Sequence, residues 1–160
     1  MSTMTNLLTG VEDLLLKKDV NYEKEEKCIY FVGAVEDDDA YEMKFFSFEN
    51  DQIILFSDYG EKIPEDKRLI VVEFIVRINN MFPLGDFEMF IDEGFVQYKI
   101  SNILKGAMLS EEILDEMVND ALFAMDISHP GFMAICNEGK SALEAFTIVE
   151  SGLMNKYQVM

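Results

Sequence analysis

The amino-acid sequence predicts an α+β fold: a five-stranded, mostly antiparallel sheet with helices packed on one face, in the order α-βββ-α-ββ-α-α. Apolar residues recur at helical spacing in four segments, and five other segments are rich in β-forming residues or alternate in polarity. Short connections between the β segments imply antiparallel neighbours. With 160 residues, 3 Pro and 9 Gly, the chain is expected to form a single domain, 1–160.

The first helix and the first three strands are predicted from apolar patterning. An apolar stripe runs from Leu7 to Leu15 and ends near two lysines, which suit a helix C-terminus. Segments 27–35, 41–48 and 52–57 are the expected strands of an antiparallel meander. The acidic run 36–39 is expected to be the solvated loop between the first two.

Segment 64–82 is predicted to be a helix, although its run of β-branched residues also suits a buried strand. Glu73, Arg77 and Asn80 are separated by four and three residues, so they line one helical face. Pro64 with two acidic residues after it is a helix-start signal. We expect this helix to be buried around most of its circumference.

A hairpin and two further helical segments complete the predicted order. Segments 87–91 and 95–100 are strands joined by Asp-Glu-Gly, a sequence typical of tight turns. Ser110 is expected to cap a long helix, which 128–131 interrupts because proline removes a backbone donor. The helical pattern then resumes and stops at Gly139.

The last helix is predicted from a capping box. Ser141 and Glu144 have the spacing at which each side chain bonds the other residue's backbone N–H, and the helix is expected to run to about Ser151.

Charge and targeting signals narrow the classes of partner. The 31 acidic and 13 basic residues give a net charge of -18, which disfavours binding to nucleic acid or to an anionic membrane surface. The first eight residues lack the pattern of a secretion signal, and no run of eighteen apolar residues occurs. We therefore expect a cytoplasmic protein without a membrane span.

No motif in the sequence predicts a catalytic, cofactor or metal site. His129 stands alone beside a proline and is interpreted as a packing or helix-breaking residue. The Gly139–Ser141 stretch resembles the end of a phosphate-binding loop but lacks its first glycine and its preceding strand. Cys28 and Cys136 are interpreted as buried free thiols, with a disulfide as the open alternative. A non-enzymatic protein without cofactors is expected.

A set of short motifs runs along 72–144. They are Glu73-Phe74, Arg77-Ile78-Asn79, Gly85-Asp86-Phe87-Glu88, the hairpin 92–98, Leu109-Ser110-Glu111-Glu112, His129-Pro130-Gly131-Phe132-Met133-Ala134, Gly139-Lys140-Ser141 and Glu144-Ala145. These motifs resemble the YbjN-like family, also described as bacterial sensory transduction regulators, with the best match over 64–150. The resemblance implies the fold of type III secretion chaperones, which bind unfolded segments of partner proteins.

Strand alternation predicts a second sheet face that is half polar and carries several aromatic residues. Tyr41, Met43 and Phe45 are expected to face the helices. The opposite face is the candidate binding site for another protein or an unfolded protein segment. As an alternative, a helix or a second subunit covers this face. A homodimer that forms through this face or through the middle helix is a further possibility. The candidate residues are Phe31, Phe46, Phe48, Phe90 and Phe95.

These expectations favour a protein-binding regulator or chaperone-like adaptor. A small-ligand sensor with a cavity between sheet and helices is the alternative function, and acidic mimicry of nucleic acid is a third.

Overall fold

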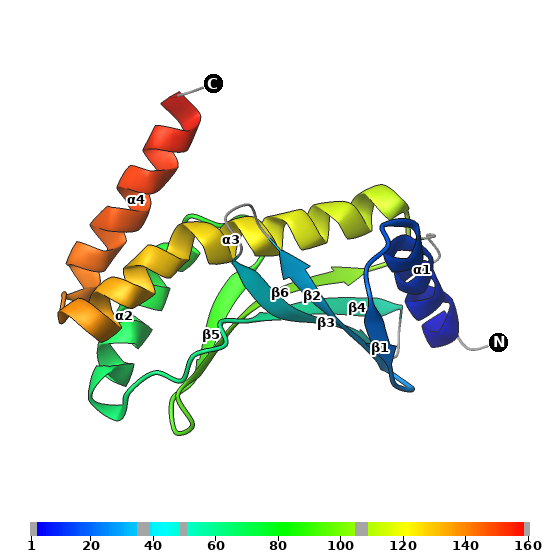
Figure 1. The fold of residues 1–160 in the computed structure, drawn as a ribbon, viewed down its shortest axis with the longest axis horizontal. Helices are drawn as coiled ribbons and strands as arrows, with labels where there is room; N and C mark the ends of the chain where they lie inside the picture. Colours follow the sequence, from blue (N-terminus) through cyan, green and yellow to red (C-terminus); the bar gives the residue numbers. More distant parts are fainter. Residues whose placement is uncertain (1–2, 35–38, 49–50, 105–108, 159–160) are drawn as a thin grey trace.

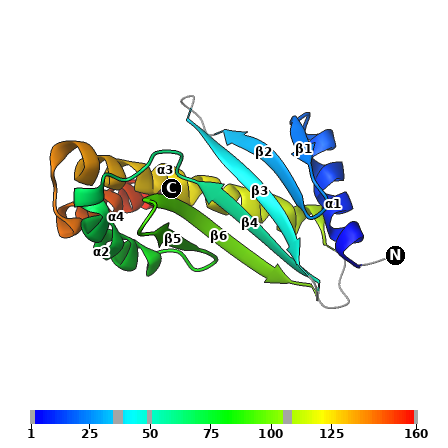
Figure 2. The ribbon, with the colours of Figure 1, turned by 90° about the horizontal axis from the view of Figure 1, so that it is seen from below.

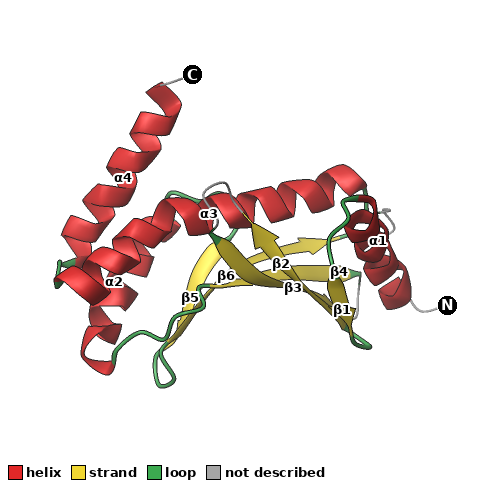
Figure 3. Ribbon diagram, in the orientation of Figure 1, coloured by secondary structure: helices red, strands yellow, loops and turns green. Residues whose placement is uncertain are grey.

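The structure is a computed structural model that describes residues 3–34, 39–48, 51–104 and 109–158. Within these residues, one antiparallel sheet and four α-helices account for most of the chain (Figures 1 and 3). The elements are α1 (Thr3–Lys17), β1 (Tyr22–Lys24), β2 (Cys28–Ala34), β3 (Ala40–Phe48), β4 (Gln52–Asp58), a 3₁₀ turn (Glu65–Lys67), α2 (Arg68–Asn79), β5 (Asp86–Phe90), β6 (Phe95–Ile103), α3 (Glu111–Glu138) and α4 (Ala142–Gln158).

The helices lie on one face and at the ends of the sheet. The strand order is β1-β2-β3-β4-β6-β5, and every neighbouring pair is antiparallel. Helix α1 packs on β2 and β3, and α3 packs on β2, β4 and β6. Helix α2 packs against β5, and α4 packs on α2 and α3. Figure 2, seen from below, shows the strands in front of α3 with no described helix across their near face.

The core forms between the helices and the face of the sheet toward them. Alternation along each strand turns every second side chain into this layer, and Phe45, Leu55 and Tyr98 are fully buried there. Phe132 of α3 contacts Phe74 of α2 edge to face, with ring centroids 5.0 Å apart. Because a buried large apolar side chain contributes about 1.5–3 kcal/mol, this layer is the main source of stability.

Helix caps confirm the local signals read from the sequence. The Ser110 hydroxyl accepts a hydrogen bond from the Ile113 backbone N–H at 3.2 Å. Gly139 ends α3 with φ of 66°, a conformation that glycine adopts without steric cost. Ser141 and Glu144 form the reciprocal capping box, with bonds of 2.8 and 3.1 Å.

The predicted interruption of the long helix is wrong. Helix α3 continues through Pro130, and Figure 1 shows one helix that changes direction along its length. Ser128, Gly131 and Phe132, which flank the proline, are buried. Tertiary packing therefore holds the turn that the missing backbone donor weakens. The last helix is also longer than predicted, and Lys156 near its end bonds the Asp126 carboxylate of α3 at 3.1 Å.

Two further expectations require correction. The sheet has six strands in the described residues, because the three-residue edge strand β1 was not predicted. Helix α2 is buried on one side only: Leu69 and Val76 are 75% and 64% exposed, because the helix lies at the end of the sheet. The two cysteines are free thiols, Cys28 buried and Cys136 half-buried.

Candidate functional site

The candidate site is the outer face, defined as the face of the sheet that points away from α1 and α3. The structure places Phe46, Phe48, Phe90 and Phe95 on this face, as the alternation predicts. The prediction for Phe31 is wrong: its side chain points to the helices, is only 7% exposed and stacks on Phe45 in the core, with ring centroids 5.8 Å apart. The physical reason is register, since Phe31 pairs with the inward-facing Met43.

The aromatic residues do not form one platform. Phe46 and Phe48 lie together on β3, with ring centroids 4.6 Å apart. Phe90 and Phe95 pair across the β5–β6 hairpin at the opposite end of the sheet. On β6, Phe95 and Ile103 are separated by eight residues, roughly 26 Å at about 3.3 Å per residue. The outer face therefore has two apolar ends with a polar band between them.

Strand register arranges the polar band in rows that cross the strands. In the acidic row, Val32 pairs with Glu42, and Asp58 pairs with Gln97. Glu42 and Asp58 are the next residues beyond the Met43–Ser57 pair, so they are cross-strand neighbours. Two residues along each strand, about 6.6 Å away, the mixed row contains Glu23, Tyr30, Lys44, Phe56, Lys99 and Asp86.

The next row on the outer face is apolar. Phe46 pairs with Cys28 on one side and with Ile54 on the other. Cys28 and Ile54 are buried although they point away from the helices. Burial raises the pKa of the Cys28 thiol, which keeps it protonated. On β6 the row continues to Ser101, and the exposed Phe48 and Ile103 lie beyond it, so this end of the outer face is mainly apolar.

Electrostatic pairing is uneven along the polar band. Glu88 is paired with Lys99 and accepts a hydrogen bond from the Gln97 amide at 3.0 Å. Burial favours a higher pKa for the Glu88 carboxyl, but these two donors outweigh it and lower the pKa. Asp58 behaves oppositely: burial raises its pKa and outweighs the lowering effect of the nearby Lys44, and the Glu42 carboxylate adds a smaller rise.

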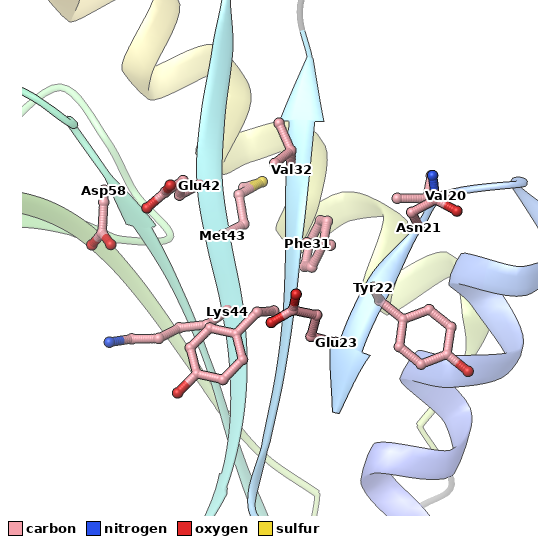
Figure 4. Close-up of a pocket in the computed structure, with 11 residues that line it drawn as sticks. Val20, Asn21, Tyr22, Glu23, Phe31, Val32, Glu42, Met43, Lys44 and Asp58 are labelled. Carbon is pink, nitrogen blue, oxygen red and sulfur yellow. The ribbon is translucent and has the colours of Figure 1, made fainter. Parts of the chain in front are cut away.

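An open groove lies where β1 begins beside β2. Strand β1 joins the edge of β2 at Phe31 and pairs only with residues 29–31, so it does not cover that edge at Val32. A groove of about 800 Å³ lies at this place, between the segment leading into β1 and the outer face of β2 and β3 (Figure 4). Its lining includes three carboxylates and one lysine: Glu23, Glu42, Asp58 and Lys44.

Other candidate chemistry is accounted for by packing. His129 belongs to the continuous helix α3, and its ring centroid is 5.6 Å from that of Tyr59. The Gly139–Ser141 stretch is a helix end followed by a cap. Of the acidic run, 36–38 lie outside the described residues. Among the residues that are described, no group of three or more His, Cys, Asp or Glu could hold a metal ion.

A search of the described helices for a segment able to cross a membrane found none.

Sequence reasoning missed the groove because it missed β1. Alternation with Tyr41 and Met43 puts Glu42 on the outer face, but the expected strand 52–57 stops before Asp58, so the sequence did not predict that the two carboxylates lie together. The signal available was Tyr22, a β-forming residue before the charged run 23–27. A three-residue edge strand is too short for periodicity to reveal it.

The chain was compared with family models, curated proteins and solved structures. No family model and no curated protein matches it. The crystal structure of the ExsC-ExsE complex matches with a TM-score of 0.55 and 13% identity, covering 79% of this chain and 92% of that one. YbjN from E. coli, a candidate transcription regulator, matches with a TM-score of 0.55 and 11% identity, covering 75% and 86%.

A third similar structure is the HopA1-SchA chaperone-effector complex, with a TM-score of 0.50, 12% identity and coverage of 77% and 94%. These matches agree with the resemblance that the sequence motifs indicate. The chain therefore has a YbjN-like, chaperone-like α+β fold.

Proposed function

We propose that the protein is a chaperone-like adaptor that holds a segment of a partner protein against its outer face, by binding and without a catalytic step. The observation that carries this proposal is an exposed set of large apolar side chains on a rigid sheet. Exposed apolar side chains gathered at one place, as at each apolar end of this face, mark interaction sites in soluble domains. The set consists of Tyr30, Val32, Phe48, Phe90, Phe95 and Ile103.

The structural comparisons support a protein partner. Two of the similar structures are complexes of this fold with another protein, ExsC with ExsE and SchA with HopA1, and the latter is a chaperone with its effector. A fold that presents one sheet face without a covering helix is suited to this use, because the backbone beneath the contact residues is already ordered and binding costs little conformational entropy.

A small-ligand sensor is less well supported by the geometry. Such a sensor needs a cavity between the sheet and the helices, where this chain packs fully buried side chains such as Phe45, Tyr98 and Phe132. The groove lies instead at the edge of β2, and most of its lining belongs to the outer face or to the segment before β1. An open groove on a strand edge suits an extended polypeptide.

Site-specific photo-crosslinking in cells tests the proposal. A photoreactive phenylalanine analogue is placed at Phe48 or Phe95 on the outer face, and at Glu112 on the exposed side of α3 as a control. We expect the same partner protein to be cross-linked from positions 48 and 95 and not from position 112. Equal labelling from all three positions, or none from the outer face, would contradict the proposal.

A paired substitution shows whether the apolar side chains contribute. Phe48→Ser with Phe95→Ser should reduce cross-linking from an analogue at Tyr30. The matched control is Leu69→Ser with Val76→Ser on α2, which removes a still more exposed apolar pair from a surface outside the outer face. Equal effects of the two pairs would show that general hydrophobicity, and not the outer face, holds the partner.

A further inference from the structure

We infer that the partner segment is extended and basic, with a lysine or arginine held between the groove carboxylates and an apolar side chain four residues away on the apolar row. This inference rests on the proposed function and adds the chemistry of the partner. It follows from three features of the outer face: its unpaired carboxylates, the partial burial of Asp58, and the spacing of its rows.

The groove carboxylates lack the cations that carboxylates elsewhere in the molecule have. Within the described part of the chain, Glu23, Glu42 and Asp58 form no ion pair, whereas Glu88, Glu12 and Glu111 each have a lysine partner. Like charges directly opposite each other on neighbouring strands destabilise a sheet. Glu42 and Asp58 are the next positions beyond the Met43–Ser57 pair, so a guest cation that contacts both carboxylates gains attraction from each.

The lysine inside the groove lowers the pKa of Asp58, but in the described residues it forms no ion pair with Asp58 or Glu42. The Lys44 ammonium lies over the Phe56 ring, 5.1 Å from its centroid. The pKa of Asp58 stays raised despite this lysine, because the carboxyl is half-buried and Glu42 is close. A guest cation beside the half-buried Asp58 acts in a partly desolvated setting, where Coulomb attraction exceeds its value in bulk water, whereas its attraction to the exposed Glu42 is weaker. An arginine would also present its flat guanidinium to the exposed Tyr30 ring.

The spacing of the rows fits an extended chain that runs along the strands. Glu42 and Phe46 are four residues apart on β3, and Asp58 and Ile54 are four apart on β4. An extended guest directs every second side chain to one face at the same repeat of about 6.6 Å. A basic residue at the acidic row therefore brings the residue four positions away to the apolar row, across Phe46 and Ile54.

Charge separates this occupant from the alternatives. A second copy of the chain would bring an identical acidic groove to the contact and carries the same net charge of -18. Nucleic acid and acidic peptides would meet the same repulsion. A basic and apolar segment satisfies both the carboxylates and the exposed apolar side chains, so it is the occupant for which the surface is complementary.

Synthetic peptides test the inference on the full chain. The probe is a threonine-rich peptide with one arginine and, four residues later, one leucine. One control has glutamate in place of arginine, and a second has serine in place of leucine. By fluorescence anisotropy at low salt, we expect the probe to bind about tenfold or more tightly than either control, and added salt to weaken it. Equal affinity of the glutamate peptide would overturn the inference.

Two matched double variants locate the effect. Glu42→Gln with Asp58→Asn should lower the affinity for the arginine peptide about tenfold or more. Glu112→Gln with Glu116→Gln removes the same charge from an exposed side of α3 and should leave the affinity unchanged. Equal losses would assign the binding to the overall field of the protein and refute the groove. Thermal unfolding verifies that both variants are folded.

The outcomes distinguish this inference from the proposed function. If a partner is cross-linked from positions 48 and 95 but the groove variant retains it, the basic-segment inference fails and the proposed function stands. If the partner segment found by mapping the cross-links is acidic or uncharged, the result is the same. If no partner is cross-linked from the outer face, both fail.

Discussion

The two faces of the sheet use the same residue types for opposite purposes. On β3, Phe45 is fully buried under the helices, whereas Phe48, three residues later, is 41% exposed on the outer face. On β6, Tyr98 is fully buried and Phe95 is 54% exposed. Aromatic content therefore does not identify the core; the helices that cover one face decide it. Substitutions on the core face should lower the free energy of unfolding strongly, and substitutions on the outer face should lower it little.

The largest expected contrast is between Phe45→Ala and Phe48→Ala. Removing the Phe45 ring leaves a cavity in a close-packed layer and should lower the free energy of unfolding by about 3–5 kcal/mol. Removing the exposed Phe48 ring should cost about 1 kcal/mol or less. Denaturation of both variants by urea measures the difference. Equal losses would show that Phe48 is buried in solution, for example by a second copy of the chain.

A hydrogen bond that crosses the core gives the next effect. The Tyr98 hydroxyl on β6 donates to the Asp120 carboxylate of α3 at 2.8 Å. Burial raises the pKa of Asp120, and the bond from Tyr98 opposes that rise. Tyr98→Phe should cost about 1.5–3 kcal/mol at neutral pH and raise the pKa of Asp120 further.

The pH dependence of Tyr98→Phe follows from that direction. A carboxyl with a raised pKa in the folded state favours the fold when it is protonated, and that contribution is lost as the pH rises through the folded pKa. The extra loss in Tyr98→Phe should therefore shrink in acid. Urea denaturation of Tyr98→Phe and of the unsubstituted protein, from neutral to acid pH, measures this change in the loss of stability, with Tyr30→Phe on the outer face as the control. A loss that does not change with pH would assign it to packing alone.

Two helical glycines give a smaller and sharper contrast. A Cβ added at Gly131 of α3 would clash with the fully buried Phe74 ring, whereas one at Gly152 of α4 would lie 3.2 Å from the end of the Ile127 side chain. Gly131→Ala should destabilise by about 1–3 kcal/mol through overpacking. Gly152→Ala should be near neutral, because its better helix propensity offsets a mild contact. Thermal unfolding compares them; a stabilised Gly131→Ala would show that α3 can shift.

What could be predicted from the sequence depended on how local the signal was. The Ser110 cap, the Gly139 helix end and the Ser141–Glu144 box act within one turn, and each was predicted at the right residue. The continuity of α3 through Pro130 was not, because contacts distant in sequence hold the turn.

The face of Phe31 was also beyond a sequence argument, since only pairing with Met43 determines it. The same holds for the candidate site. Its aromatic residues on β3, β5 and β6 were assigned to the correct face, but their separation into two ends is a property of strand register. The acidic row needs β4 to extend to Asp58 and the groove needs β1, and neither has a pattern long enough to detect.

Asp58→Asn gives the smallest effect on stability and the most informative one. Burial raises the pKa of the Asp58 carboxyl and Glu42 adds to the rise, so its ionised form costs stability above that pKa. The amide removes this cost, and the fold should gain a few tenths of a kcal/mol at neutral pH, a gain that disappears in acid. Urea denaturation at neutral and at acid pH measures the gain in the free energy of unfolding.

The same substitution should weaken binding of the basic peptide. A residue that lowers the stability of the fold while raising its affinity for a partner is an example of the trade-off between stability and function. If Asp58→Asn instead destabilises the fold at neutral pH, the carboxylate has an internal partner and Lys44 already neutralises it. The difference between the two faces would then be one of exposure only, and charge would have no part in choosing what the outer face binds.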